Sequence, residues 1–170
     1  MGINAPCPIA DTHDVTSFDC GDTTLNDWLQ RRAIKNENSG ASRTFVVCED
    51  NTVIGYYSLA VGAIASEDTS GKVRRNMPDP IPVMVLGRLA VNANWQGKHI
   101  GIGMLKDAIQ RTLIVAEQAG IRALLVHALS DKARSFYQRW GFQESPTNDM
   151  TLMITLDEAR NAMTELDLNP

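Results

Sequence analysis

A chain of 170 residues with 44% hydrophobic and 21% charged side chains has the composition of a globular protein, so we expect one domain over residues 1–170. Its net charge of −4 excludes a uniformly basic nucleic-acid binder, although basic residues can still gather on one face. It contains no apolar run near the ~20 residues of a membrane span and no recognisable signal peptide. Its three cysteines lack CxxC spacing. Together these features predict a cytoplasmic protein with reduced thiols, no membrane association and no metal site.

The first predicted element is a helix over residues 25–36. Its apolar side chains recur at three- to four-residue spacing, as an amphipathic helix requires: Leu25, Trp28, Leu29 and Ala33. Asp22 or Thr23 can cap its start, and Gly40 ends the region.

A hairpin follows. Residues 43–50 and 52–64 are rich in β-branched and aromatic side chains, and a polar turn at residues 49–51 joins them. The next segment, residues 66–82, is polar and interrupted by prolines, so we expect an exposed loop.

The second half predicts strands and helices in alternation. Residues 82–91 form a nearly continuous apolar run, typical of a strand buried on both faces. After the glycine-rich residues 96–103, an amphipathic helix runs to about Gly120. Its apolar positions are Met104, Leu105, Ala108, Ile109 and Leu113.

The remaining segments predict a buried strand over residues 121–129, a short helix over residues 131–140 closed by Gly141, and a last strand over residues 151–156. The tail from Asp157 can be helical. This order of elements predicts an α/β fold, a mixed sheet with helices packed on it.

The glycine-rich turn at residues 96–103 is the strongest chemical signal. A helix that begins there offers unpaired backbone N–H groups and the positive end of its dipole, which together bind pyrophosphate. The turn lacks the GK[ST] of a Walker motif, and Gly101-Ile102-Gly103 lacks the third glycine of a dinucleotide fingerprint. A strand–helix turn without a ligand is the remaining alternative.

Here the sequence resembles the GCN5-related N-acetyltransferase (GNAT) family, whose acetyl-CoA loop reads Q/R-x-x-G-x-G/A at the start of the central helix. The matching run is Gln96-Gly97-Lys98-His99-Ile100-Gly101, followed by Gly103. The resemblance implies that these residues bind acetyl-CoA as a co-substrate. His99 stands where the family usually has its first glycine, and its imidazole either contacts a phosphate or is merely tolerated there.

A second motif resembles the family's N-x-x-A-x-x-F/L-Y-x-x-x-G-F. Residues 130–142 read SDKARSFYQRWGF, with Ser130 in place of the common asparagine. The resemblance implies that Ser130, Lys132, Ala133 and Phe136 contribute to the coenzyme site and that Tyr137 is catalytic. A phenol can protonate the departing thiolate of coenzyme A; the alternative is that Tyr137 only packs against the pantetheine.

The family resemblance also implies a mostly antiparallel central sheet with splayed central strands. Backbone N–H groups of Leu89, Ala90 and Val91 would then bind the coenzyme arm and polarise the acetyl carbonyl.

No carboxylate stands out as a general base, because the early candidates Glu49, Asp50, Glu67 and Asp68 fall in predicted turns or loops. An α-amine has a reference pKa of ~7.7–8.0, against ~10.4 for lysine, so deprotonating lysine at neutral pH costs roughly 3 kcal/mol more. An enzyme without a strong base therefore suits an α-amine better, unless it uses a chain of water molecules.

Residues 25–64 and 73–91 add a more specific resemblance, to the acetyltransferase toxins of bacterial type II toxin–antitoxin systems. It implies acetylation of the α-amine of the amino acid on charged tRNA, which blocks translation. It also implies a ribbon-helix-helix antitoxin, a homodimer, and binding of operator DNA only by the toxin–antitoxin complex.

Basic residues can provide a track of phosphate contacts for tRNA: Arg31, Arg32, Lys35, Lys72, Arg74, Arg75 and Arg88. For each cluster the alternative is an ordinary solvated surface, and for Arg88 a structural ion pair. Two other functions stay open: a small-molecule or protein N-acetyltransferase, and a non-catalytic module that binds coenzyme A or DNA.

Overall fold

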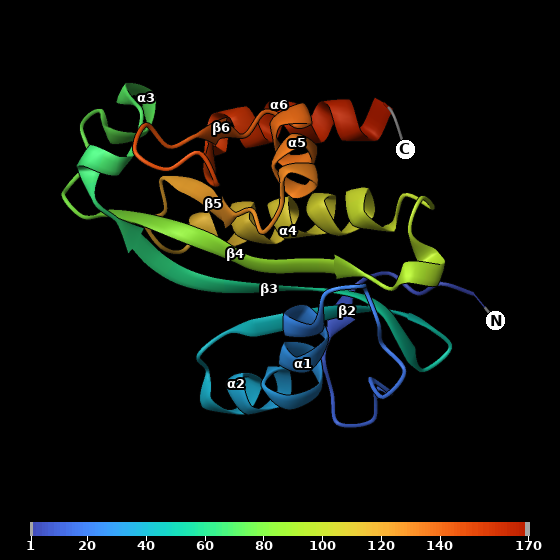
Figure 1. Ribbon diagram of the computed structural model, residues 1–170. Helices are drawn as coiled ribbons and strands as arrows, with labels where there is room; N and C mark the ends of the chain where they lie inside the picture. Colours follow the sequence, from blue (N-terminus) through green and yellow to red (C-terminus); the bar gives the residue numbers. More distant parts are fainter. Residues whose placement is uncertain (1, 169–170) are drawn as a thin grey trace. The chain divides into compact units, whose positions relative to one another are not determined.

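A computed structural model describes residues 2–168 (Figure 1). Its strands are β1 (Cys7–Pro8), β2 (Arg43–Glu49), β3 (Thr52–Ile64), β4 (Ile81–Val91), β5 (Ala123–His127), β6 (Gln143–Glu144) and β7 (Thr151–Thr155). Its α-helices are α1 (Thr23–Arg31), α2 (Ala33–Ser39), α3 (Gly71–Arg74), α4 (Ile100–Ala116), α5 (Asp131–Arg139) and α6 (Leu156–Leu168). Two short 3₁₀ turns are η1 (Ser66–Asp68) and η2 (Ala93–Trp95).

The strands follow the order β1-β2-β3-β4-β5-β7-β6. Only the β4–β5 pair is parallel among the pairs recorded for the described strands, so the predicted mixed, mostly antiparallel α/β sheet with helices is confirmed. The chain forms two compact units. The first comprises residues 2–60 and 87–108, and the second comprises residues 61–86 and 109–168.

In the first unit, β2 pairs with β1 and β3 in antiparallel register, which confirms the predicted hairpin. Helices α1 and α2 contribute Trp28, Leu29 and Ala33 to a buried core that also contains Val46 and Tyr56. The start of α4 packs closely on β3 at Gly55, where an added Cβ would lie 3.1 Å from the Met104 Cε. This contact holds the beginning of α4, and with it the glycine-rich turn, against the strand.

In the second unit, β4 pairs with β5 from Val83↔Ala123 to Leu86↔Val126. Strand β4 then continues five residues past this register, to Val91. Strand β7 pairs antiparallel with β5 and with β6. The core here includes Val73 of α3, packed among residues of β4, β5 and β7.

The predicted single helix over residues 25–36 is wrong in one respect, because the chain forms two helices that break at Arg32 (φ −118°). Asp22, not Thr23, caps the first: its carboxylate accepts hydrogen bonds from the backbone N–H groups of Thr24 and Leu25. The second helix ends at Gly40 in the left-handed conformation (φ 79°), as expected.

The segment over residues 66–82 is more ordered than the exposed loop we predicted. It contains η1 and α3, and both Thr69 and Val73 are buried. The expectation that residues 82–91 are buried on both faces holds only for the first half of β4, since its residues from Gly87 on are mostly half-exposed.

The tail from Asp157 is helical, and α6 begins with a capping box. The Glu158 carboxylate accepts hydrogen bonds from the Thr155 backbone N–H (3.1 Å) and hydroxyl (2.9 Å), while the Glu158 N–H donates to the Thr155 hydroxyl (3.3 Å). None of the helices in the described residues is long and apolar enough to cross a membrane.

Candidate active site

The turn between β4 and α4 is tied to the first unit by its polar side chains and backbone. The Gln96 side-chain amide donates to the carbonyls of Val91 (2.9 Å) and Cys20 (3.2 Å). The Asn92 N–H donates to the Ile54 carbonyl at 2.8 Å. Gln96 therefore holds the turn in place with its side chain, which leaves only its backbone for a ligand.

Two residues of the turn lie in the left-handed region, Gly97 (φ 79°) and His99 (φ 64°). The His99 carbonyl accepts the hydrogen bond from the Gly103 N–H (3.1 Å) that opens α4. A left-handed residue other than glycine costs about 1–2 kcal/mol, and histidine is among the residues that adopt it more often. His99 thus adopts the left-handed backbone conformation that a glycine would favour at this position.

The turn has room for a phosphate group. An added Cβ at Gly97 or Gly103 would meet no atom within 4 Å, and the residues from Gln96 to His99 are exposed. The Lys98 ammonium lies 5.1 Å from the centroid of the Trp95 ring. Because Ile100, Gly101 and Ile102 form the first turn of α4, their N–H groups have no acceptor inside the helix. These features fit the pyrophosphate of acetyl-CoA.

Leu89, Ala90 and Val91 form the end of β4, just before the turn. Ala90 is buried in the core of the first unit, and the other two are half-exposed. These three residues lie beyond the last recorded β4–β5 pair, Leu86↔Val126. Their backbone groups on that side are therefore not used in pairing with β5 and can bind a ligand.

The second unit carries the other motif on α5. The Ser130 hydroxyl accepts a hydrogen bond from the Ala133 N–H (3.1 Å) and so caps the helix. Gly141 (φ 98°) ends the helix, and the Phe142 N–H donates to the Tyr137 carbonyl at 3.2 Å. The side chain of Ser130, like that of Gln96, is used by the fold itself.

Tyr137 is 6% exposed and lies between two aromatic rings, with centroids 5.3 Å from Phe136 and 5.3 Å from Phe142. Burial raises the pKa of the Tyr137 phenol above its ordinary value. The phenol is therefore neutral at physiological pH and able to donate a hydrogen bond. Lys132 is exposed, while Ala133 and Phe136 are half-buried.

The predicted basic residues have different surroundings in the two units. In the first, Arg31, Arg32 and Lys35 are exposed, whereas Arg88 is half-buried with its guanidinium 4.1 Å from the Trp28 ring centroid. Arg88 thus makes a cation–π contact with Trp28 in place of the ion pair considered as the alternative. Burial lowers the pKa of Arg88, and the positive charge of Arg32 acts in the same direction.

In the second unit the Lys72 ammonium pairs with Glu158 at 3.0 Å, and Arg74 donates to the Thr69 carbonyl. Arg75 is exposed. Sequence reasoning missed Arg122 and Arg160, which lie near Lys72 and Arg75; no spacing rule connects these four positions. Among the described residues no cluster of histidine, cysteine and carboxylate side chains could hold a metal ion.

Comparison with known proteins places these features in a family. The family model of the acetyltransferase (GNAT) domain matches residues 40–144. The tRNA-acetylating toxin of Mycobacterium tuberculosis is 49% identical over 159 residues, which cover 94% of this chain and 96% of that protein.

Two solved structures extend the similarity. AtaT complexed with acetyl-methionyl-tRNAfMet has a TM-score of 0.86 at 25% identity, over 94% of this chain and 98% of its own. A mutant AtaT toxin bound to the C-terminus of the antitoxin AtaR and to acetyl-CoA has a TM-score of 0.81 at 25% identity, over 96% of this chain and 99% of its own. The chain therefore belongs to the GNAT acetyltransferases and, among them, to the family of the tRNA-acetylating toxins.

Proposed function

We propose that this protein is the toxin of a type II toxin–antitoxin system and transfers an acetyl group from acetyl-CoA to the α-amine of the amino acid on charged tRNA. The observation that carries the proposal is the 49% identity to the tRNA-acetylating toxin of M. tuberculosis over 94% of the chain. The structural similarity to AtaT in complex with acetyl-methionyl-tRNAfMet supports the same substrate.

Acetyl-CoA supplies the activated acetyl thioester. The backbone of Gln96, Gly97, Lys98, His99, Ile100, Gly101 and Gly103 binds its pyrophosphate at the start of α4. Leu89, Ala90 and Val91 bind the coenzyme arm and polarise the acetyl carbonyl through their main chain. Ser130, Lys132, Ala133 and Phe136 line the coenzyme on the α5 side. The open space around Gly97 and Gly103 supports the first of these assignments.

The transfer forms a bond from the amine nitrogen to the acetyl carbon and breaks the carbon–sulfur bond, whose electron pair goes to sulfur. Tyr137 donates a hydrogen bond and then its proton to that sulfur, and the proton released by the amine restores the phenol. The burial of Tyr137 keeps the phenol protonated at neutral pH, which this role requires.

The amine needs no strong base, because a substantial fraction of an α-amine with a pKa of ~7.7–8.0 is already neutral near pH 7.5. An aminoacyl ester offers such an amine, and the tRNA attached to it is held through phosphates by Arg31, Arg32, Lys35, Lys72, Arg74, Arg75 and Arg88.

The proposal extends to the partners. An antitoxin of the ribbon-helix-helix class neutralises the enzyme, the toxin is a homodimer in the cytoplasm, and only the toxin–antitoxin complex binds operator DNA. The AtaT structure with the C-terminus of its antitoxin supports an antitoxin that docks on the toxin. Residues 1–170 act as a single GNAT domain.

The test is to incubate the purified protein with labelled acetyl-CoA and charged tRNA, with uncharged tRNA and free amino acids as parallel controls. We expect label only on the aminoacyl group. If a protein that binds acetyl-CoA leaves charged tRNA unlabelled and acetylates a small amine or a protein instead, the tRNA assignment is wrong.

A further inference from the structure

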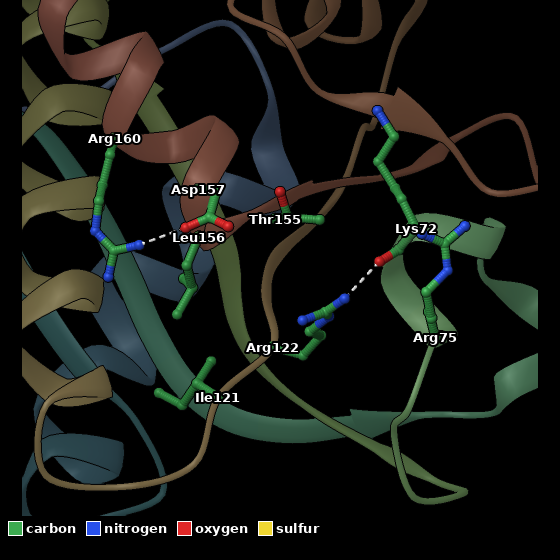
Figure 2. A pocket seen from close by; sticks show the side chains of 8 residues that line it. All are labelled: Lys72, Arg75, Ile121, Arg122, Thr155, Leu156, Asp157 and Arg160. Carbon is green, nitrogen blue, oxygen red and sulfur yellow. Dashed lines mark hydrogen bonds and ion pairs between the residues drawn. The ribbon is translucent and has the colours of Figure 1, made fainter.

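The second unit contains a cavity of about 420 Å³ (Figure 2). Three segments line it: α3 and its end, the residues just before β5, and the junction of β7 with α6. The lining residues are Lys72, Arg75, Ile121, Arg122, Thr155, Leu156, Asp157 and Arg160. None of them belongs to the glycine-rich turn or to residues 130–142.

The charge of this cavity is positive. Its wall carries four cationic side chains and one carboxylate, Asp157, which pairs with Arg160 at 2.8 Å. Lys72 pairs with Glu158 at 3.0 Å. The Arg160–Asp157 pair is exposed to solvent, and exposed ion pairs contribute only about 0–1 kcal/mol, so an entering anion can compete for Arg160. The Lys72–Glu158 pair is partly buried.

Two arginines of the cavity are not paired with a carboxylate in residues 2–168. Arg122 donates from Nε to the Val73 carbonyl (3.0 Å) and from Nη2 to the Lys72 carbonyl (2.7 Å). These bonds fix its guanidinium beside α3 and leave part of its five-donor fork for another acceptor. Arg75 ends α3 and is exposed. A half-buried guanidinium held by carbonyls gains from a nearby anion, because carbonyls do not neutralise its charge.

The start of α6 adds a second feature that favours anions. Its capping box satisfies Thr155 and Glu158, but Leu156 and Asp157 are the first residues of the helix and their N–H groups have no acceptor within it. A helix of 13 residues brings the positive end of its dipole to this point. Its first turn also carries the carboxylates of Asp157 and Glu158, which are paired with Arg160 and Lys72.

The remaining wall is apolar. Ile121 and Leu156 are half-buried and lie between the Arg160 and Arg122 side chains in Figure 2. A bare inorganic ion would leave this surface unused, whereas an organic phosphate with a flat base would cover it. The volume lies in the range of about 300–1,000 Å³ typical of small-molecule sites.

From this combination we propose that the cavity binds a nucleotide, with the phosphate beside Arg75, Arg122 and the start of α6 and the base against Ile121 and Leu156. The nucleotide bound there can come from two sources: it is either a free nucleotide or a nucleotide of the substrate RNA. Because Lys72 and Arg75 are also among the residues assigned to tRNA above, the RNA source rests on the proposed function, whereas the free-nucleotide source does not. Binding of either probe can be measured without turnover.

The experiment measures binding of AMP, and separately of a short uncharged RNA duplex, to protein saturated with coenzyme A, so that the coenzyme site is filled. The variants are Arg75→Gln and Arg160→Gln, which leave the carbonyl bonds of Arg122 intact. The matched control is Arg139→Gln, which removes the same charge from an exposed position of α5 outside the cavity. Circular dichroism checks that each variant is folded.

We expect Arg75→Gln, which removes a cation placed beside the phosphate, to weaken binding about tenfold, the loss typical of one charge-assisted hydrogen bond. Arg160→Gln should weaken binding by a smaller factor, and the control should stay within about twofold. If AMP binds and the cavity variants weaken its binding more than the control does, the ligand is a free nucleotide. If only the RNA duplex binds and its binding is weakened in the same way, the ligand is a nucleotide of RNA. The proposal is overturned if neither probe binds, or if the cavity variants and the control weaken binding equally. If the protein transfers no acetyl group to charged tRNA, the proposed function is refuted, whereas AMP binding with this pattern would still stand.

Discussion

The guanidinium of Arg88 lies 4.1 Å from the centroid of the Trp28 ring, so a charged residue of β4 is held by an aromatic residue of α1. Trp28 in turn stacks on Tyr56 of β3, with centroids 5.8 Å apart and planes 9° apart. The Tyr56 hydroxyl donates to the Leu25 carbonyl at 2.7 Å. This stack fixes the strand residue that directly precedes the main-chain groups assigned to the coenzyme.

The first prediction concerns the stability that this contact provides. In a double-mutant cycle with Arg88→Met and Trp28→Leu, the coupling in the free energy of unfolding should be about 0.5–2 kcal/mol, the range of cation–π contacts from exposed to desolvated sites. Urea denaturation of the four proteins measures it. A coupling near zero would mean that Arg88 stabilises the fold only through its aliphatic stem.

The second prediction separates chemistry from packing at Tyr137. Tyr137→Phe should lower kcat about 10²–10⁴-fold, because it removes the proton donor, while the KM for acetyl-CoA and the melting temperature change little. No hydrogen bond to the Tyr137 hydroxyl is recorded among the described residues, so its loss leaves no buried partner unsatisfied.

A matched control for this variant is Tyr57→Phe. The Tyr57 hydroxyl donates to Asp107, so this substitution should lower stability and leave kcat nearly unchanged. An acetyl-transfer rate that survives in Tyr137→Phe would contradict the proton-donor role.

Much of the fold could be predicted from periodicity, since the hairpin and the strand–helix alternation leave clear patterns. The break at Arg32 could not, because no glycine or proline marks it and the burial of Trp28 and Ala33 fits a continuous helix equally well. Helix α3 escaped prediction because Val73 is its single buried residue in a polar, proline-containing segment. The capping box of Thr155 and Glu158 has the three-residue spacing that marks a helix start in a sequence.

The candidate site was predictable only where it depends on local sequence. The glycine-rich turn and the Ser130–Phe142 motif can be recognised by spacing. The Arg88–Trp28 contact and the cluster of Lys72 with Arg122 cannot, because each joins residues about 50 or more positions apart in the chain.

The third prediction tests what His99 contributes. If only its left-handed backbone matters, His99→Gly should bind acetyl-CoA within about threefold of the parent, since glycine adopts φ 64° without strain. His99→Val should weaken binding by tenfold or more, because a β-branched residue is strained there. Calorimetric titration with acetyl-CoA measures both. Weak binding by the glycine variant would show that the imidazole itself contacts the ligand.

The fourth prediction concerns the pH dependence of stability at Glu158. Partial burial favours the neutral carboxyl, but the hydrogen bonds from Lys72 and from Thr155 outweigh it and hold the pKa of Glu158 below its ordinary value. A carboxyl with a lowered pKa in the folded state stabilises the protein above its unfolded pKa of ~4.3 and loses that contribution as pH falls through the folded value.

Glu158→Gln should therefore unfold at lower urea concentration than the parent at pH 7, and the two should converge as the pH falls below 4. The control is Glu67→Gln, an exposed carboxyl in η1 outside the capping box, which should show no comparable gap at pH 7. A gap for Glu158→Gln that stays constant from pH 7 to pH 3 would mean that the charge of Glu158 contributes nothing and that only the geometry of its carboxyl group matters. The pH series decides between these accounts because protonation removes the charge while keeping the carboxyl group in place.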